Sequence, residues 1–157
     1  MLTIIKKPII LTTLLTVVCL SLASFSPLPG GENYRIYVNK KLVMEKYVSN
    51  NMTAAYLTLT PANVNDKIDI MYNHCGQTGT ARHLVIKDEQ NKVVKDLKFA
   101  DANGPDIMMS FGAKEILSLQ KGDNPPKLRL YYSSKELPAG KLLATLVRGS
   151  TLNVARI

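Results

Sequence analysis

One stretch of the chain holds four side chains that could ligate a metal ion or attack a substrate. They are a thioether, two imidazoles and a thiol, at Met71, His74, Cys75 and His83. Thiolate and imidazole ligands suit zinc or copper, and a thioether can be a weak axial ligand of copper. A thiol activated by a nearby imidazole is also a nucleophile. The residue types therefore raise two hypotheses, a metal-binding (Cu/Zn) or redox protein using Cys75 and His83, and a small cysteine hydrolase.

The spacing of these residues argues against both hypotheses. His74 and Cys75 are adjacent, so their side chains diverge in an extended chain. The spacing matches no structural zinc pattern, and no second cysteine follows. We therefore assign no catalytic residue, metal or cofactor, and interpret Cys75 as a small buried thiol at a strand end that reacts slowly with thiol reagents.

The elements around these residues read as strands. Residues 66–74 alternate, with the apolar side chains on one face, and the alternation resumes at 82–87 and again at 93–99. The two glycines within 75–79 indicate a turn. The pattern predicts an antiparallel meander, in which the strands flanking 75–79 are neighbours and His83 can approach Cys75.

The N-terminus has the features of a secretory signal. Two lysines precede an apolar run at 8–20, and Ser21 to Ala23 offer small residues at the positions that a signal peptidase needs. We expect 1–23 to be a cleaved signal peptide and 24–32 a flexible linker, leaving no transmembrane span after processing. A retained anchor is the alternative, but the run is short for a span. A lipoprotein site at Cys19 is weaker still, because a valine precedes it.

Composition limits the class of protein and its partners. The chain has 157 residues with 20 basic and 12 acidic side chains, and the signal carries two of the basic ones, so the mature chain has 18 against 12 and a net charge of +6. Such an excess favours an anionic partner. The lysines are scattered without a run of five, so we expect no specific nucleic-acid recognition. Only one cysteine remains, so a hydrophobic core must stabilise the fold without an intramolecular disulfide.

Turn residues divide the rest of the chain into short apolar-alternating segments. Strands are predicted at 33–39, 41–48, 53–60, 66–74, 82–87, 93–99, 107–111, 128–132 and 142–147, with 113–120 either a strand or one short helix. About eight or nine short strands at this spacing predict a single antiparallel β-sandwich over 33–148, with a C-terminal tail at 149–157. A small β-barrel is the alternative. The resulting hypothesis is an exported non-enzymatic protein, periplasmic or extracellular, with a binding or structural role toward an unknown partner in the cell envelope.

The export prediction can be tested directly. Protein recovered from the envelope should begin at Ser24, because the small residues before it complete the cleavage site. Intact-mass measurement checks this. A retained full-length chain contradicts the prediction, and a lipid on Cys19 would replace it.

Overall fold

The computed structural model describes residues 31–48, 55–76, 79–102, 104 and 107–150. The predicted signal peptide, most of the linker and the tail from residue 151 lie outside the described residues. Within the described part, no helix has the length and apolar character needed to cross a membrane.

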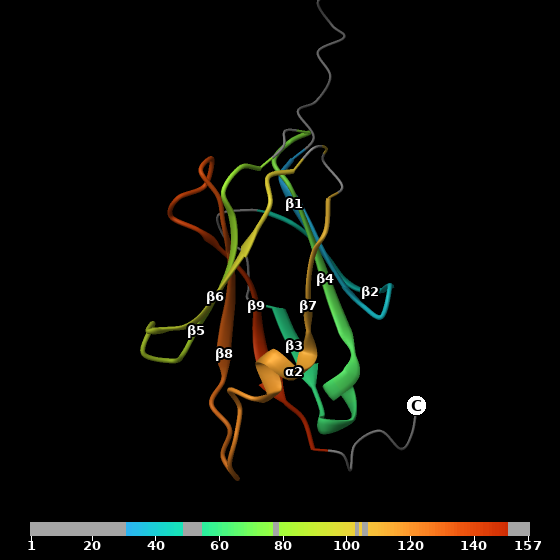
Figure 1. Cartoon of the computed structure of the whole chain (residues 1–157), viewed down its shortest axis with the longest axis vertical. Helices are drawn as coiled ribbons and strands as arrows, with labels where there is room; N and C mark the ends of the chain where they lie inside the picture. The colour runs from blue at the N-terminus through green and yellow to red at the C-terminus, as the bar shows by residue number, and fades with distance from the viewer. Residues whose placement is uncertain (1–30, 49–54, 77–78, 103, 105–106, 151–157) are drawn as a thin grey trace, which may run out of the picture. The chain divides into compact units, whose positions relative to one another are not determined.

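Nine strands form two sheets in the described part of the chain (Figure 1). The four-stranded sheet has the order β2-β1-β4-β7, with bounds Lys41–Tyr47, Asn33–Val38, Lys67–Asn73 and Met109–Gly112. The five-stranded sheet has the order β3-β9-β8-β5-β6, with bounds Ala55–Leu59, Lys141–Arg148, Leu128–Ser133, Arg82–Lys87 and Val93–Phe99. The sheets are separate rather than closed into a ring, so the sandwich prediction is confirmed and the barrel alternative is wrong. Every neighbouring pair is antiparallel except β3 and β9, which run parallel.

The predicted meander is wrong at its first connection. Strands β5 and β6 do form an antiparallel hairpin, but β4 belongs to the other sheet and pairs with β1 and β7. The segment after His74 therefore crosses from one sheet to the other. Local alternation could not reveal this, because a hairpin and a crossing of the sandwich both need a glycine-containing break between two strands.

Two short helical segments close one end of the sandwich. Residues Pro61–Asn65 form a 3-10 turn, and Ala113–Leu117 form the single α-helix of the described residues, α2. The ambiguous segment 113–120 therefore begins as a helix, and the strand before it, β7, begins two residues later than predicted. Lys95 of β6 forms an ion pair of 2.7 Å with Glu115 of α2, which ties the helix to the edge of the five-stranded sheet.

The core consists of the inward-facing residues of both sheets. Its largest fully buried side chains are Tyr34, Tyr132, Ile36, Leu59, Ile68, Ile70, Leu84, Ile86, Met109, Ile116, Leu128 and Leu130. They come from β1, β3, β4, β5, β7, β8 and α2, and β9 adds the buried Leu143, Ala144 and Leu146. The edge strands β2 and β6 reach the core only with partly buried residues. Residues of this kind at alternate positions are what the sequence pattern predicts for a sheet with one buried face.

Strand β4 departs from that pattern because both of its faces are covered. Asp69 and Met71 point away from the core, yet they are only 4% and 3% exposed. Ser110 donates a hydrogen bond of 2.5 Å to Asp69, and the Lys67 ammonium lies 3.1 Å away. Burial raises the pKa of Asp69, but the Ser110 and Lys67 contacts outweigh it, so the pKa lies below its ordinary value and the carboxylate stays charged.

A hydrogen bond through the core joins the two sheets. Leu143 is the extra residue where the register of β8 and β9 shifts, so its carbonyl is not fixed by a regular ladder position. The buried Tyr34 hydroxyl donates to that carbonyl at 2.6 Å. Burial raises the pKa of Tyr34 to about 12, so the phenol remains a donor at neutral pH. Strand β1 is thereby attached to β9 across the sandwich.

Removing this hydroxyl should destabilise the domain. Tyr34→Phe keeps the ring but leaves a buried carbonyl without its donor, which costs roughly 1–3 kcal/mol of unfolding free energy. Tyr56→Phe is the matched control, because Tyr56 is 66% exposed, and a surface change of this kind stays within about 0.5 kcal/mol. Denaturant unfolding measures both variants, and equal stabilities would contradict the role of the Tyr34 bond.

Candidate functional site

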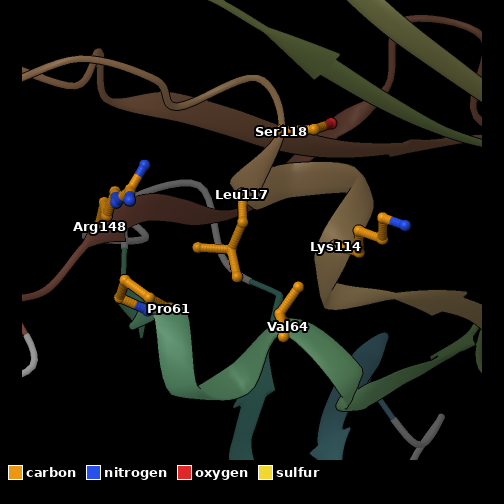
Figure 2. Close-up of a pocket in the computed structure, with 6 residues that line it drawn as sticks. All are labelled: Pro61, Val64, Lys114, Leu117, Ser118 and Arg148. Carbon is orange, nitrogen blue, oxygen red and sulfur yellow. The ribbon is translucent and has the colours of Figure 1, made fainter.

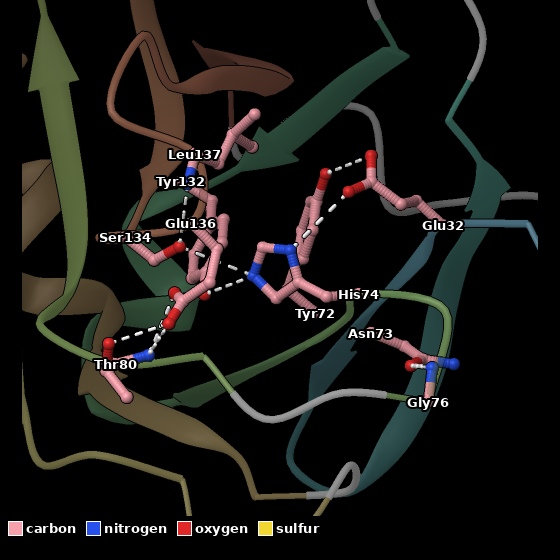
Figure 3. A network of polar contacts seen from close by, with 10 residues as sticks. All are labelled: Glu32, Tyr72, Asn73, His74, Gly76, Thr80, Tyr132, Ser134, Glu136 and Leu137. Carbon is pink, nitrogen blue, oxygen red and sulfur yellow. Dashed lines mark hydrogen bonds and ion pairs between the residues drawn. The ribbon is translucent and has the colours of Figure 1, made fainter.

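His74 lies inside the sandwich rather than on a surface site. Its ring lies beside the rings of Tyr72 of β4 and Tyr132 of β8, tilted against both at centroid distances of 4.8 and 5.4 Å (Figure 3). The two tyrosine rings stack at 4.2 Å with planes 15° apart, and the hydroxyl of Tyr132 lies 2.9 Å from His74 Nε2. Burial raises the pKa of both tyrosines, so both phenols remain protonated. We call Tyr72, His74, Tyr132, Glu32 and Ser134 the inter-sheet cluster, since it connects β4 to β8.

Glu32 and Ser134 complete this cluster from opposite sides of the imidazole. Glu32 accepts a hydrogen bond of 3.2 Å from the Tyr72 hydroxyl, and its other oxygen lies 3.5 Å from His74 Nδ1. Ser134 Oγ lies 3.4 Å from His74 Nε2 and accepts the Leu137 amide at 3.2 Å. A hydroxyl, an imidazole and a carboxylate thus lie in the order of a hydrolase triad. However, His74 is only 7% exposed and Ser134 only 5%, and the Tyr132 hydroxyl lies nearer to Nε2 than Ser134 Oγ does.

Cys75 lies on the surface, so its expected burial is wrong, and the slow reaction with thiol reagents loses the burial on which that prediction depended. It occupies a left-handed conformation with φ 53°, followed by Gly76 at φ 84°, and Asn73 Oδ1 accepts the Gly76 amide at 2.7 Å. Two successive left-handed residues turn the chain sharply away from β4. This turn carries the thiol out of the sheet and exposes it.

Carboxylates from two other loops hold Thr80 and Ala81, which lead into β5. Glu136 accepts hydrogen bonds from the amide and hydroxyl of Thr80, at 3.0 and 2.7 Å, and these contacts lower the pKa of Glu136 to about 2. Asp101 accepts the Ala81 amide at 2.7 Å. Gly79 packs directly against Tyr132, where a Cβ would overlap the hydroxyl. Residues 79–81 are therefore held against Tyr132, Glu136 and Asp101.

The four side chains with metal-ligand chemistry do not converge. Met71 is buried on β4, His74 is buried in the inter-sheet cluster, Cys75 is exposed on the turn, and His83 lies on β5 in the other sheet. The strand adjacency that would have brought His83 to Cys75 is absent. Within the described residues, no group of three or more His, Cys, Asp or Glu side chains could hold a metal ion.

His83 instead lies in a pocket on the outer face of the five-stranded sheet. Its Nδ1 is 2.9 Å from Asp96 of β6, and Ser133 of β8 is its direct cross-strand partner. This pocket has a volume of about 460 Å³, and its lining also includes Val85 and Lys135. Asp96 orients the imidazole, which leaves Nε2 to interact with a bound molecule.

A smaller pocket of about 190 Å³ continues along the same strands and shares Val85, Ser133 and Pro138 with the first. We call the two together the β5–β8 groove. The Lys87 ammonium lies 4.7 Å from the centre of the Tyr131 ring and marks its far end. Its wall is the 134–140 loop, held by a Lys135 amide bond to the Thr80 carbonyl at 2.9 Å and by bonds within the loop. The protein's own hydrogen bonds therefore preorganise the wall of the groove.

A third pocket, of about 300 Å³, lies between the 3-10 turn and α2. Figure 2 shows Leu117 directed toward Pro61 and Val64, with Lys114 and Arg148 at its two ends. Arg148 donates to the Gln120 carbonyl, so one of its nitrogens is already engaged. This pocket is an apolar joint between two short helical segments, with fewer polar groups than the β5–β8 groove.

Searches against models of known protein families and against curated proteins found no match. The candidate site therefore depends on geometry alone. The sequence singled out His83 but missed Asp96, Ser133 and Lys135, which reach it only through the order β8-β5-β6. The alternation of apolar residues did place His83 and Lys87 on the same outward face of β5, and this was the one sequence feature that pointed to the groove.

The close approach of Gly79 to Tyr132 predicts a specific pattern of coupling. Gly79→Ala should destabilise the domain by roughly 1–3 kcal/mol, since the added methyl overlaps the Tyr132 hydroxyl. Tyr132→Phe removes that oxygen, so the same alanine should cost less in its presence, and a double-mutant cycle by denaturant unfolding measures the difference. Additive effects would contradict the contact.

Proposed function

We propose that this chain is an exported, non-enzymatic β-sandwich protein that binds a component of the cell envelope through the β5–β8 groove. The observation that carries the proposal is the groove itself. It joins two pockets of about 460 and 190 Å³ with an oriented His83–Asp96 pair, a hydroxyl and two lysines in their lining. A preformed cavity with a few placed polar groups is the usual form of a ligand site.

The chemistry of the groove supports binding over catalysis. Asp96, His83 and Ser133 come from three adjacent strands, and an acid, an imidazole and a hydroxyl in that order would suit a serine hydrolase. However, Ser133 and His83 share no hydrogen bond in the described part of the chain, although they are direct cross-strand partners. The histidine is oriented by Asp96 and remains available as a hydrogen-bonding group for a ligand.

The metal-binding and cysteine-hydrolase hypotheses receive no comparable support. Both need His83 near Cys75, and the two residues belong to different parts of the sandwich, with β4 and β5 in separate sheets. An exposed thiol without an oriented imidazole lacks the base that nucleophilic catalysis requires. Export remains an expectation from the N-terminal sequence, and it is the reason that we propose an envelope component as the ligand.

Filling the groove should abolish binding. Ser133→Trp places a large ring in the part of the groove that both pockets share. Thr145→Trp is the matched control, because Thr145 is a half-buried hydroxyl residue on the outer face of the neighbouring strand β9 that does not line the groove. Co-sedimentation with the insoluble envelope fraction of the producing cells should be retained by the wild type and Thr145→Trp and lost by Ser133→Trp.

Folding of both variants is checked by far-ultraviolet circular dichroism and thermal melting. Sedimentation of a folded Ser133→Trp protein at the wild-type level would contradict the groove as the binding surface. Failure of the wild type to sediment at all would contradict the envelope as its place of action.

A further inference from the structure

We infer that the β5–β8 groove binds a linear polysaccharide that carries carboxylate groups. This inference rests on the proposed binding function and adds the chemical class of the ligand. The charges around the groove support it. The ionisable side chains that line it are Lys87, Lys135, His83, Tyr131 and Asp96, so Asp96 is the single carboxylate in the lining. Two lysines against this one carboxylate, which His83 contacts at 2.9 Å, give the lining an excess of positive charge.

Positive charge lies at both ends of the groove. At one end, Lys135 lines the pocket and Lys98 is the cross-strand partner of His83 on the same face. At the other end, Lys87 lies opposite Arg129 in the register. On β5, Lys87 follows His83 by four positions, so the two ends lie about 13 Å apart along the strand. Two cationic ends at this separation favour an extended ligand with repeated negative charges over a single small anion.

The groups between the two ends suit a sugar chain. Ser133 supplies a hydroxyl, Asp96 uses one carboxylate oxygen for His83, and His83 bonds Asp96 through Nδ1 alone. The Ser133 hydroxyl, the second Asp96 oxygen and His83 Nε2 can therefore exchange hydrogen bonds with the hydroxyl groups of a polysaccharide. Val85 forms an apolar floor beneath them that the carbon face of a sugar ring can cover.

The same groove is poorly suited to nucleic acid. Binding of a single strand uses aromatic rings on which bases stack, but the Lys87 ammonium already lies over the Tyr131 ring at 4.7 Å. Arginine commonly binds phosphate through its two parallel N–H groups. Arg129 instead donates to the backbone carbonyls of Asp88 and Glu89, at 3.2 and 2.6 Å. Lysines as separate point charges match carboxylates spaced along a sugar polymer.

Titration with defined polymers tests the inference. The probes are an oligogalacturonate, a neutral glucan oligomer of equal length, heparin and single-stranded DNA, each followed by isothermal calorimetry at two salt concentrations. The oligogalacturonate should bind most tightly and weaken as salt is raised. Lys87→Gln with Lys135→Gln should weaken its binding at least about tenfold, because two charge-assisted contacts are lost. Lys114→Gln with Lys121→Gln removes the same charge from exposed positions outside the groove and should leave binding unchanged.

The other outcomes separate this inference from the proposed function. Equal binding of the neutral oligomer, tighter binding of heparin or DNA, or equal weakening by both pairs of substitutions would overturn the carboxylated polysaccharide as ligand. Absence of binding to all four probes, with groove-dependent sedimentation of the envelope retained, would also overturn it while leaving the proposed function intact. Loss of both would overturn the two together.

Discussion

The contact between Tyr72 and Tyr132 is the interaction on which the rest of the structure depends. The sandwich consists of two separate sheets, so side chains must join them, and these two rings stack across the gap at 4.2 Å. His74 lies against both rings and bonds the Tyr132 hydroxyl. Stacked aromatic rings add about 0.5–1.5 kcal/mol beyond their burial. The bonded hydroxyl and imidazole also satisfy polar groups that would otherwise be costly inside a core.

The segment that leads into β5 packs against the same contact. Gly79 is the residue that lets the crossing pass beside the Tyr132 hydroxyl, since any side chain there would overlap it. The Thr80–Glu136 bonds then fix the crossing against the 134–140 loop. The same loop is the wall of the β5–β8 groove. Packing inside the sandwich and the shape of the groove on its outer face are therefore set by one connected group of residues.

The two histidines differ in burial, and this difference gives the same side chain two different roles. His74 is buried beside the stacked rings of Tyr72 and Tyr132 and has its nitrogens directed at Tyr132 and Glu32, so it contributes to stability. His83 is held by Asp96 on an outer face, beside a pocket of about 460 Å³. Two imidazoles only nine positions apart in the sequence thus lie in a core and on a surface, because the crossing between them changes sheet.

The sequence by itself determined the class of fold, most of the strands and their buried faces. Alternation of apolar residues is a local property, so Ile68, Ile70 and Leu84 could be placed in the core without knowledge of strand order. The partners of each strand were decided only by the tertiary structure, because pairing depends on contacts between distant segments. That is why the meander was wrong at its first connection and why alternation did not show that β3 and β9 run parallel. The β5–β8 groove shows the same limit, since Ser133 and Asp96 meet His83 only after β8, β5 and β6 have become neighbours.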